Sequence, residues 1–308
     1  MALTLKEAVK RPELLSGGHR ACAGCAAPVI LRQVMRAAGR DTVVSFATGC
    51  MEVSTTIFPD TAWNVSYIHN AFENSAATMS GVESAYRALK RKGKIDRKMN
   101  FIAFGGDGGT YDIGFQSLSG AMERGHNMLY ICYDNEAYMN TGIQRSSSTP
   151  KGAHTNTSQA GKVRQGKGEH KKDLTHVMIA HGIPYVAQAS PHNPVDLMRK
   201  VEKACAIEGP AFMNIFASCN RGWRIPMEQS IEVGKDAADC CVWPLFEVEN
   251  GSWTLNYKPR EKKPIKDYLL AQGRFKHLKK EENQYIIDEL QEQVDKRWDW
   301  ILSNCEGK

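Results

Sequence analysis

The chain alternates between short, wholly apolar segments and longer segments whose apolar residues recur every three to four positions. The first kind is typical of strands buried on both faces, and the second of amphipathic helices. The alternation predicts an α/β fold with a doubly wound, mostly parallel sheet covered by helices on both faces. Strands are predicted at 42–48, 100–109, 127–135, 183–190 and 211–218, and helices at 27–39, 72–93, 115–125, 173–182 and 195–209.

The composition changes near residue 245. Residues 249–278 are polar and basic, and a helical pattern follows at 281–304. We predict a cofactor-binding domain at 1–244 and a C-terminal extension at 245–308 that packs on partner subunits. No apolar run approaches the roughly 18 residues of a membrane span, and the N-terminus does not resemble a secretory leader. We therefore expect a cytoplasmic protein, and the mild net charge of +6 gives no reason to expect nucleic-acid binding.

A glycine turn follows one of the predicted strands. In parallel sheets, ligands bind at the carboxyl ends of strands. The turn Gly106-Asp107-Gly108-Gly109 lies at such an end, and Asn135 lies at the end of the next strand, with room for one crossover helix between them. Glycines let a diphosphate approach the backbone, and the Asp107 and Asn135 oxygens suit a bridging Mg²⁺. This pattern is the thiamine diphosphate signature.

Two other glycine patterns fail as phosphate-binding motifs. Residues 161–168 approach the P-loop pattern, but Gly168 stands where the magnesium-binding Ser or Thr belongs, and no apolar strand precedes the segment. We interpret this segment as a solvent-exposed loop. The Rossmann pattern fails at 106–111, because Tyr111 replaces its third glycine.

Nine cysteines are many for a chain in a reducing compartment, and their odd number and irregular spacing make a poor disulfide framework. Cys22 and Cys25 form a CxxC pair that could hold zinc, an iron–sulfur cluster or a redox dithiol. Cys50 and Cys219 follow predicted strands, at the edge of the sheet where Asp107 would lie. The remaining cysteines are interpreted as small core residues (Cys132 and Cys205) or as residues without evident partners (Cys240, Cys241 and Cys305).

Five ordered motifs resemble the β subunit of the 2-oxoacid:ferredoxin oxidoreductases, most closely its pyruvate branch, over roughly residues 15–245. They are GHRACAGC (18–25), ATGCMEV (47–53), TAWNVSYIHNAFEN (61–74), GDGGTYDIGFQSLSGAMERGH (106–126) and YDNEAYMNTGIQRSSSTP (133–150). The resemblance implies thiamine diphosphate, Mg²⁺ and one [4Fe–4S] cluster. It also implies oxidative decarboxylation of a 2-oxo acid, with single electrons passing to the cluster and coenzyme A collecting the acyl group.

The resemblance also implies a role for individual residues. The cluster would be held by Cys22, Cys25, Cys50 and Cys219, with Cys50 also near the thiamine. Mg²⁺ would be held by Asp107, Asn135 and the carbonyl group of Ala137. Asn140 would lie nearest the reacting carbon, although a turn-capping role for its amide stays open. The cofactor-binding set is Gly106, Asp107, Gly108, Gly109, Asn135, Glu136, Ala137, Tyr138, Met139, Asn140, Thr141 and Cys50.

By the same resemblance, this chain is half of an active site. The glutamate that activates thiamine would come from a partner α subunit, with Glu52 and Glu73 as weaker candidates here, and γ and ferredoxin-like δ subunits would complete the complex. His19 and His69 are interpreted as surface or core residues. The basic stretch 162–172 is a candidate surface for an acidic ferredoxin.

One departure and several alternatives remain. Ala26 and Ala27 follow the CxxC pair where many relatives carry Gly and a polar residue, which leaves pyruvate, oxalate or a branched-chain 2-oxo acid open as substrate. A non-redox thiamine enzyme would use Asp107 and Asn135 but not the four cysteines. A non-catalytic iron–sulfur or zinc module would use the cysteines but not the Asp107–Asn135 pair.

Overall fold

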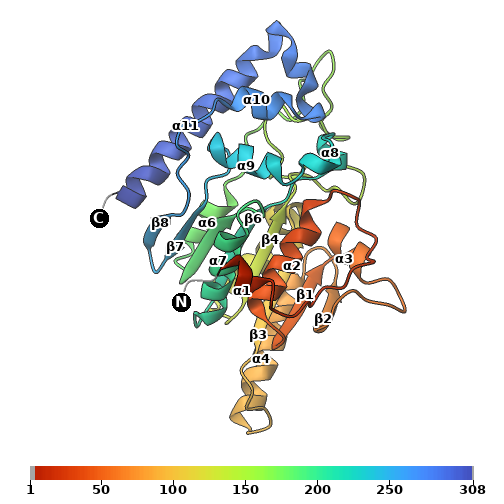
Figure 1. The fold of residues 1–308 in the computed structure, drawn as a ribbon, viewed down its shortest axis with the longest axis vertical. Coiled ribbons are helices and arrows are strands. Elements are labelled where there is room, and N and C mark those ends of the chain that lie inside the picture. The colour runs from red at the N-terminus through yellow and green to blue at the C-terminus, as the bar shows by residue number, and fades with distance from the viewer. Residues whose placement is uncertain (1–3, 307–308) are drawn as a thin grey trace.

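The computed structural model describes residues 4–306 and has one eight-stranded sheet at its centre (Figure 1). Neighbouring strands follow the order β2-β1-β3-β4-β6-β5-β7-β8, and all pairs from β2 to β5 are parallel. The doubly wound, mostly parallel sheet predicted from the sequence is confirmed. The strands are β1 (Thr42–Ala47), β2 (Ser66–Asn70), β3 (Asn100–Gly106), β4 (Leu129–Asp134), β5 (Tyr185–Ala189), β6 (Ala211–Phe216), β7 (Phe246–Glu249) and β8 (Ser252–Leu255).

Helices cover both faces of the sheet because alternate strand residues point to opposite sides. In β3, Ile102 and Phe104 pack with α2 (Ala26–Ala38) and α7 (Pro194–Ala206) in one core cluster. Phe101 and Ala103 pack on the other face, beneath the helices of a second cluster. The helices on that second face are α4 (Ser75–Arg91), α5 (Phe115–Glu123) and α6 (Leu174–Ala180).

A third core cluster lies where the C-terminal helices meet the segment after β6. Figure 1 shows α8 to α11 gathered at one end of the molecule, opposite the end where α4 protrudes. No helix in residues 4–306 is both long and apolar enough to cross a bilayer. The remaining helices are α1 (Leu5–Ala8), α3 (Cys50–Thr55), α8 (Asn220–Trp223), α9 (Glu232–Asp239), α10 (Ile265–Leu270) and α11 (Gln284–Glu306); a π-helical segment (Gly108–Ile113) and three 3₁₀ turns (Met227–Gln229, Gly273–Lys279 and Glu281–Asn283) complete the elements.

The sheet continues past the boundary predicted at residue 244. Strand β7 pairs antiparallel with β5, and β8 pairs antiparallel with β7. The first part of the predicted extension 245–308 is therefore continuous with the sheet of the preceding domain. Its packing on partner subunits stays a prediction.

The strand order places four chain segments side by side at the carboxyl edge. The chain runs from β1 outward to β2 and returns to β3 on the other side of β1, so the order reverses between β1 and β3. Ligands of open α/β sheets bind at such a switch point. Cys50 follows β1 and Asp107 follows β3, while Asn135 and Cys219 follow the neighbouring strands β4 and β6.

Candidate cofactor site

Three oxygen-bearing groups meet at the ends of β3 and β4. The side-chain amide of Asn135 lies 2.9 Å from Oδ1 of Asp107 and 2.8 Å from the carbonyl oxygen of Ala137. With the amide nitrogen turned inward, the group donates to both oxygens; with the amide oxygen turned inward, that oxygen lies beside the other two. The second orientation is the donor set that a hard cation such as Mg²⁺ requires. The residues present therefore fit a magnesium ion.

The carboxylate of Asp107 is buried where a charge is costly. Its side chain is 1% exposed. Burial, and then the neighbouring charge of Asp134, raises the pKa of Asp107 well above its usual value. Ser146 Oγ donates to Oδ2 of Asp107 at 2.5 Å and the Asn135 backbone N–H donates to Oδ1 at 3.2 Å, both neutral partners. A bound cation would offset both effects that raise this pKa.

A small hollow surrounds the glycine turn. A Cβ on Gly108 would lie 2.4 Å from the Tyr138 ring, so only glycine lets the two segments approach this closely. Eleven of the twelve residues predicted to bind cofactor line this hollow. They are Cys50, Gly106, Asp107, Gly108, Gly109, Asn135, Ala137, Tyr138, Met139, Asn140 and Thr141, together with Thr48, Gly49, Phe72 and Tyr133. Glu136 is the exception, and its side chain has other partners.

The four predicted cluster ligands line one cavity of about 270 Å³. Cys22 and Cys25 lie in a tight turn, in which the Cys25 N–H donates to the Cys22 carbonyl oxygen at 3.1 Å. Gly24 in this turn has a φ of +78°, in the left-handed region that favours glycine. Asn220 beside Cys219 donates to the Ala23 carbonyl oxygen at 3.0 Å, which joins the distant fourth cysteine to this turn.

Burial disfavours the charged thiolate form of these cysteines. Burial, with a smaller contribution from the neighbouring thiols, raises the pKa of Cys25 and of Cys50 to about 12. Binding of a positively charged metal centre favours the thiolate and offsets this cost. Within residues 4–306, no three His, Cys, Asp or Glu side chains are arranged to hold a single metal ion.

The thiol cavity and the glycine hollow share a wall. Cys50, Asn135 and Asn140 line both. Ala27, from the departure noted in the sequence, lines the thiol cavity, and it is buried together with Ala26. A group held by the cysteines and a group held on the glycine turn would therefore lie next to each other.

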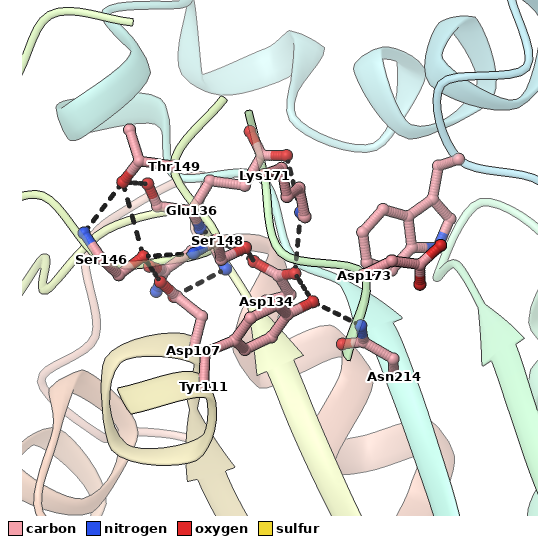
Figure 2. A network of polar contacts seen from close by, with 12 residues as sticks. Asp107, Tyr111, Asp134, Glu136, Ser146, Ser148, Thr149, Lys171, Asp173 and Asn214 are labelled. Carbon is pink, nitrogen blue, oxygen red and sulfur yellow. Dashed lines mark hydrogen bonds and ion pairs between the residues drawn. The ribbon is translucent and has the colours of Figure 1, made fainter. Parts of the chain in front are cut away.

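A buried polar network holds the end of β4, and the sequence analysis did not find it. Fully buried Asp134 accepts hydrogen bonds from Tyr111 Oη at 2.7 Å, Lys171 Nζ at 2.8 Å and Ser148 Oγ at 2.6 Å (Figure 2). The only sequence signal for this network is that an acidic residue ends a wholly apolar strand, directly before Asn135. The network fixes the backbone from which Asn135 and Ala137 extend.

Glu136 points away from the hollow and forms a second anchor. Its carboxylate pairs with Lys171 at 2.9 Å and with Arg274 at 2.5 Å. Burial would raise the pKa of Glu136, but the two cations beside it lower it. Arg274 also stacks 3.8 Å over the ring of Trp223, whose Nε1 donates to the Asn135 carbonyl oxygen at 2.8 Å. The C-terminal segment thus supports the Asn135 loop from behind.

Replacing Arg274 by methionine is expected to loosen this loop. The change leaves the 1% exposed Glu136 with one cation fewer, and breaking a buried ion pair typically costs about 3 kcal/mol. Hydrogen exchange of the Asn135 and Glu136 amides in the assembled complex measures the free energy of local opening. The control is Lys280→Met, because the Lys280–Glu282 pair is solvent-exposed and should contribute less than about 1 kcal/mol. Equal effects of the two changes would contradict the anchoring role.

Only part of the basic stretch 162–172 is the exposed charged surface that the sequence suggested. Lys171 belongs to the buried network, and Lys167 is buried and donates to the carbonyl oxygens of Ser147 and Thr149 at 3.1 and 2.6 Å. Burial lowers the pKa of Lys167 to about 8. Backbone carbonyl groups hold Lys167, whereas the carboxylates of Asp134 and Glu136 hold Lys171. The prediction of a solvent-exposed loop at 161–168 therefore holds only for part of that segment, including Lys162 and Arg164.

The other residues considered from the sequence lie outside the two hollows. Buried Glu52 pairs with exposed His69 at 2.6 Å, and Glu73 is exposed. His19 is partly buried. Among the remaining cysteines, Cys132, Cys240 and Cys241 are buried, and Cys205 and Cys305 are partly buried.

Residues 47–215 match the family described as "Thiamine pyrophosphate enzyme, C-terminal TPP binding domain". Proteins similar to this chain include pyruvate synthase subunit PorB of Methanocaldococcus jannaschii, which is 54% identical over 93% of this chain and 96% of its own. The Thermotoga maritima protein of the same name is 54% identical over 94% and 91%. Ketoisovalerate oxidoreductase subunit VorB of Pyrococcus abyssi is 46% identical over 94% and 92%.

A solved structure shares the fold. It is the 2-oxoglutarate:ferredoxin oxidoreductase from Magnetococcus marinus, with a TM-score of 0.57 and 21% identity over 72% of this chain and 79% of that one. At this identity the likeness concerns the fold of the chain. It agrees with the doubly wound arrangement described above.

Proposed function

We propose a function from one premise: the chain belongs to the β subunits of the 2-oxoacid:ferredoxin oxidoreductases, and its relatives at 54% identity are PorB subunits of pyruvate synthase. It is accordingly an oxidoreductase subunit that binds thiamine diphosphate and works with partner subunits. We infer that it also carries Mg²⁺ and one [4Fe–4S] cluster and takes part in the oxidative decarboxylation of pyruvate. The observation that carries this inference is the shared wall formed by Cys50, Asn135 and Asn140.

The oxygen donors at the ends of β3 and β4 would hold the diphosphate end of the cofactor. Asp107, the Asn135 amide oxygen and the Ala137 carbonyl group would bind Mg²⁺, which would offset the cost of burying Asp107. The backbone of Gly106, Gly108 and Gly109 would lie against the phosphates. Ser146 would orient Asp107, because its hydroxyl already donates to Oδ2 at 2.5 Å.

Thiamine diphosphate, when bound, supplies the carbanion that attacks a 2-oxo acid and takes up the electron pair that stays behind when CO₂ leaves. This chain would orient the cofactor against the glycine turn and would place the Asn140 amide beside the reacting end. The Asp134 and Glu136 anchors would keep the Asn135 loop fixed during turnover. Preorganisation of this kind lowers the cost of reaching the transition state.

The four cysteines would hold the [4Fe–4S] cluster. Four thiolates are the ligand set of such a cluster, and all four thiols line the thiol cavity beside the glycine hollow. Cys50 borders both spaces, so electrons would have a short path from thiamine to iron. A cluster carries single electrons, which suits onward transfer to ferredoxin.

The remaining parts of the site would come from partners. Neither Glu52 nor Glu73 lines the glycine hollow, which favours a glutamate from an α subunit as the activator of thiamine. We expect γ and ferredoxin-like δ subunits to complete a cytoplasmic complex, with coenzyme A as the acyl acceptor.

A substrate panel tests this function. The complex, purified anaerobically through this chain, should reduce a viologen with pyruvate in a reaction that depends on coenzyme A. The 46% identity to a ketoisovalerate oxidoreductase subunit favours branched-chain 2-oxo acids as the second candidate. Oxalate, tested without coenzyme A, completes the panel because Ala26 and Ala27 shape the site differently from many relatives. Failure of every 2-oxo acid would overturn the proposed reaction.

A further inference from the structure

The short helix α8 contacts the loops of both hollows. It begins directly after Cys219, and Asn220 Nδ2 donates to the carbonyl oxygen of Ala23 in the CxxC turn at 3.0 Å. At its other end, Trp223 Nε1 donates to the carbonyl oxygen of Asn135 at 2.8 Å. A single turn of helix therefore connects the cysteines of the thiol cavity with the loop that borders the glycine hollow.

The sulfur of Cys219 accepts a hydrogen bond from this helix. The backbone N–H of Gly222 donates to Sγ at 3.3 Å, so that Cys219 caps the N-terminus of α8. Burial raises the pKa of Cys219, and the N–H groups of Gly222 and Arg221 act against this rise because they favour the thiolate. Such N–H groups also favour negative charge on a sulfur that is bound to iron.

The side chain of Met139 fills the space beside Gly222. A Cβ on Gly222 would overlap with the thioether sulfur of Met139 and would lie 3.5 Å from Cys219 Sγ. Met139 and Cys219 therefore lie on the same side of Gly222, and both pack against the core cluster that contains Trp223. Met139 also lines the glycine hollow. Its side chain thus extends from the cofactor loop to the turn that carries the fourth cysteine.

We propose that Met139 is a positioning residue that sets the reduction potential of the iron–sulfur cluster. The inference rests on the cluster proposed above. Met139 holds Gly222 where its N–H group reaches Cys219 Sγ. An electron added to a cluster makes the ligand sulfurs more negative, so a hydrogen-bond donor at a ligand sulfur stabilises the reduced state and raises the potential. A higher potential favours the passage of electrons from the thiamine site to iron.

The midpoint potential of the cluster tests this role. It is measured by a redox titration, followed by electron paramagnetic resonance, of the anaerobic complex with saturating thiamine diphosphate. The signal of this cluster is identified as the one that is missing from the Cys25→Ser complex. Met139→Ala should lower the potential at unchanged iron content, because the turn loses its support and the hydrogen bond to Cys219 weakens. Met139→Leu fills the same space and should keep the wild-type potential.

Met198→Ala is the matched control. Met198 lies on α7, is 3% exposed and lines neither the thiol cavity nor the glycine hollow. The change removes the same atoms from another buried methionine and should leave the potential of the cluster at the wild-type value. A shift as large as that in Met139→Ala would show that general loosening of the core, and not the contact with Gly222, moves the potential.

Gly222→Ala tests the contact from the other side. The new methyl group displaces the sulfur of Met139, so this change should also lower the potential. In the double variant Gly222→Ala/Met139→Ala, the methyl group occupies the vacated space, and the shift should be smaller than the sum of the two single shifts.

Three outcomes overturn the proposal: a wild-type potential in Met139→Ala, an equal shift in Met139→Leu, or additive shifts in the double variant. Failure of the cluster assignment is recognised separately, because Cys25→Ser would then lose no signal.

Discussion

Replacing Cys25 by serine is expected to remove the iron–sulfur cluster from this chain. The rate of viologen reduction by the complex should then fall to background. Cys25 lines the cavity that all four proposed ligands share, and burial opposes a thiolate charge at this position. Serine is a poor ligand for iron in a cluster built on thiolates. Thiamine and magnesium should stay bound, because Asp107, Asn135 and Ala137 are unchanged. Iron, acid-labile sulfide and thiamine are measured in the same anaerobic preparation.

Cys205→Ser is the matched control for this prediction. Cys205 is a partly buried cysteine on α7 that does not line the thiol cavity. The same substitution there should leave iron content and activity intact. Wild-type levels of cluster iron in Cys25→Ser would contradict the assignment of the ligand, and stoichiometric zinc in place of iron in the wild type would contradict the cluster itself.

Replacing Asp107 by asparagine should weaken the binding of thiamine diphosphate and leave the cluster in place. The change removes the carboxylate that lies beside the Asn135 amide, and with it the charge that we expect to bind Mg²⁺. Removing one partner of a buried charged contact costs about 3 kcal/mol, which corresponds to a Kd for thiamine diphosphate about 100-fold higher. The cluster should remain, because no cysteine is altered. Thiamine binding is titrated in the presence of Mg²⁺.

The control for Asp107 is Asp267→Asn on α10, an exposed carboxylate outside both hollows. It should leave thiamine affinity unchanged. A Kd in Asp107→Asn equal to that of the control would contradict the magnesium site. Loss of cluster and thiamine together would indicate a folding defect, which Asp107→Glu distinguishes by keeping the charge at a shifted position.

The central sheet could be predicted because its strands are buried on both faces and therefore continuously apolar. The same reasoning missed β7 and β8, two four-residue strands that form a hairpin, of which β8 is the edge strand and is only partly buried. A signal was present: Asn250 and Gly251 connect the two strands with φ values of 48° and 79°, as a two-residue hairpin turn requires. Strand β2, the opposite edge strand, was missed for the same reason, since its side chains are only partly buried.

Some residues of the candidate site could likewise be predicted from the sequence, and others could not. Asp107 and Asn135 could be predicted, because strand ends in a parallel sheet meet at one edge. The supporting residues could not, because their positions depend on long-range packing: Arg274 reaches Glu136 from the C-terminal segment, and Lys171 reaches Asp134 from a loop that resembled an exposed basic stretch. Glu136 was assigned to the cofactor from its neighbours, but its φ of 66° and its two cationic partners direct its side chain away.

Anomalous diffraction from anaerobically grown crystals of the assembled complex tests the central claim most directly. Data collected on both sides of the iron absorption edge give the position of each iron atom. A cluster in this chain is thereby distinguished from clusters in other subunits. We predict a four-iron signal enclosed by Cys22, Cys25, Cys50 and Cys219. We also predict a non-anomalous ion that contacts Asp107, Asn135 and the carbonyl group of Ala137 beside thiamine diphosphate. A zinc signal among the cysteines, or thiamine bound away from the glycine turn, would contradict the proposed function.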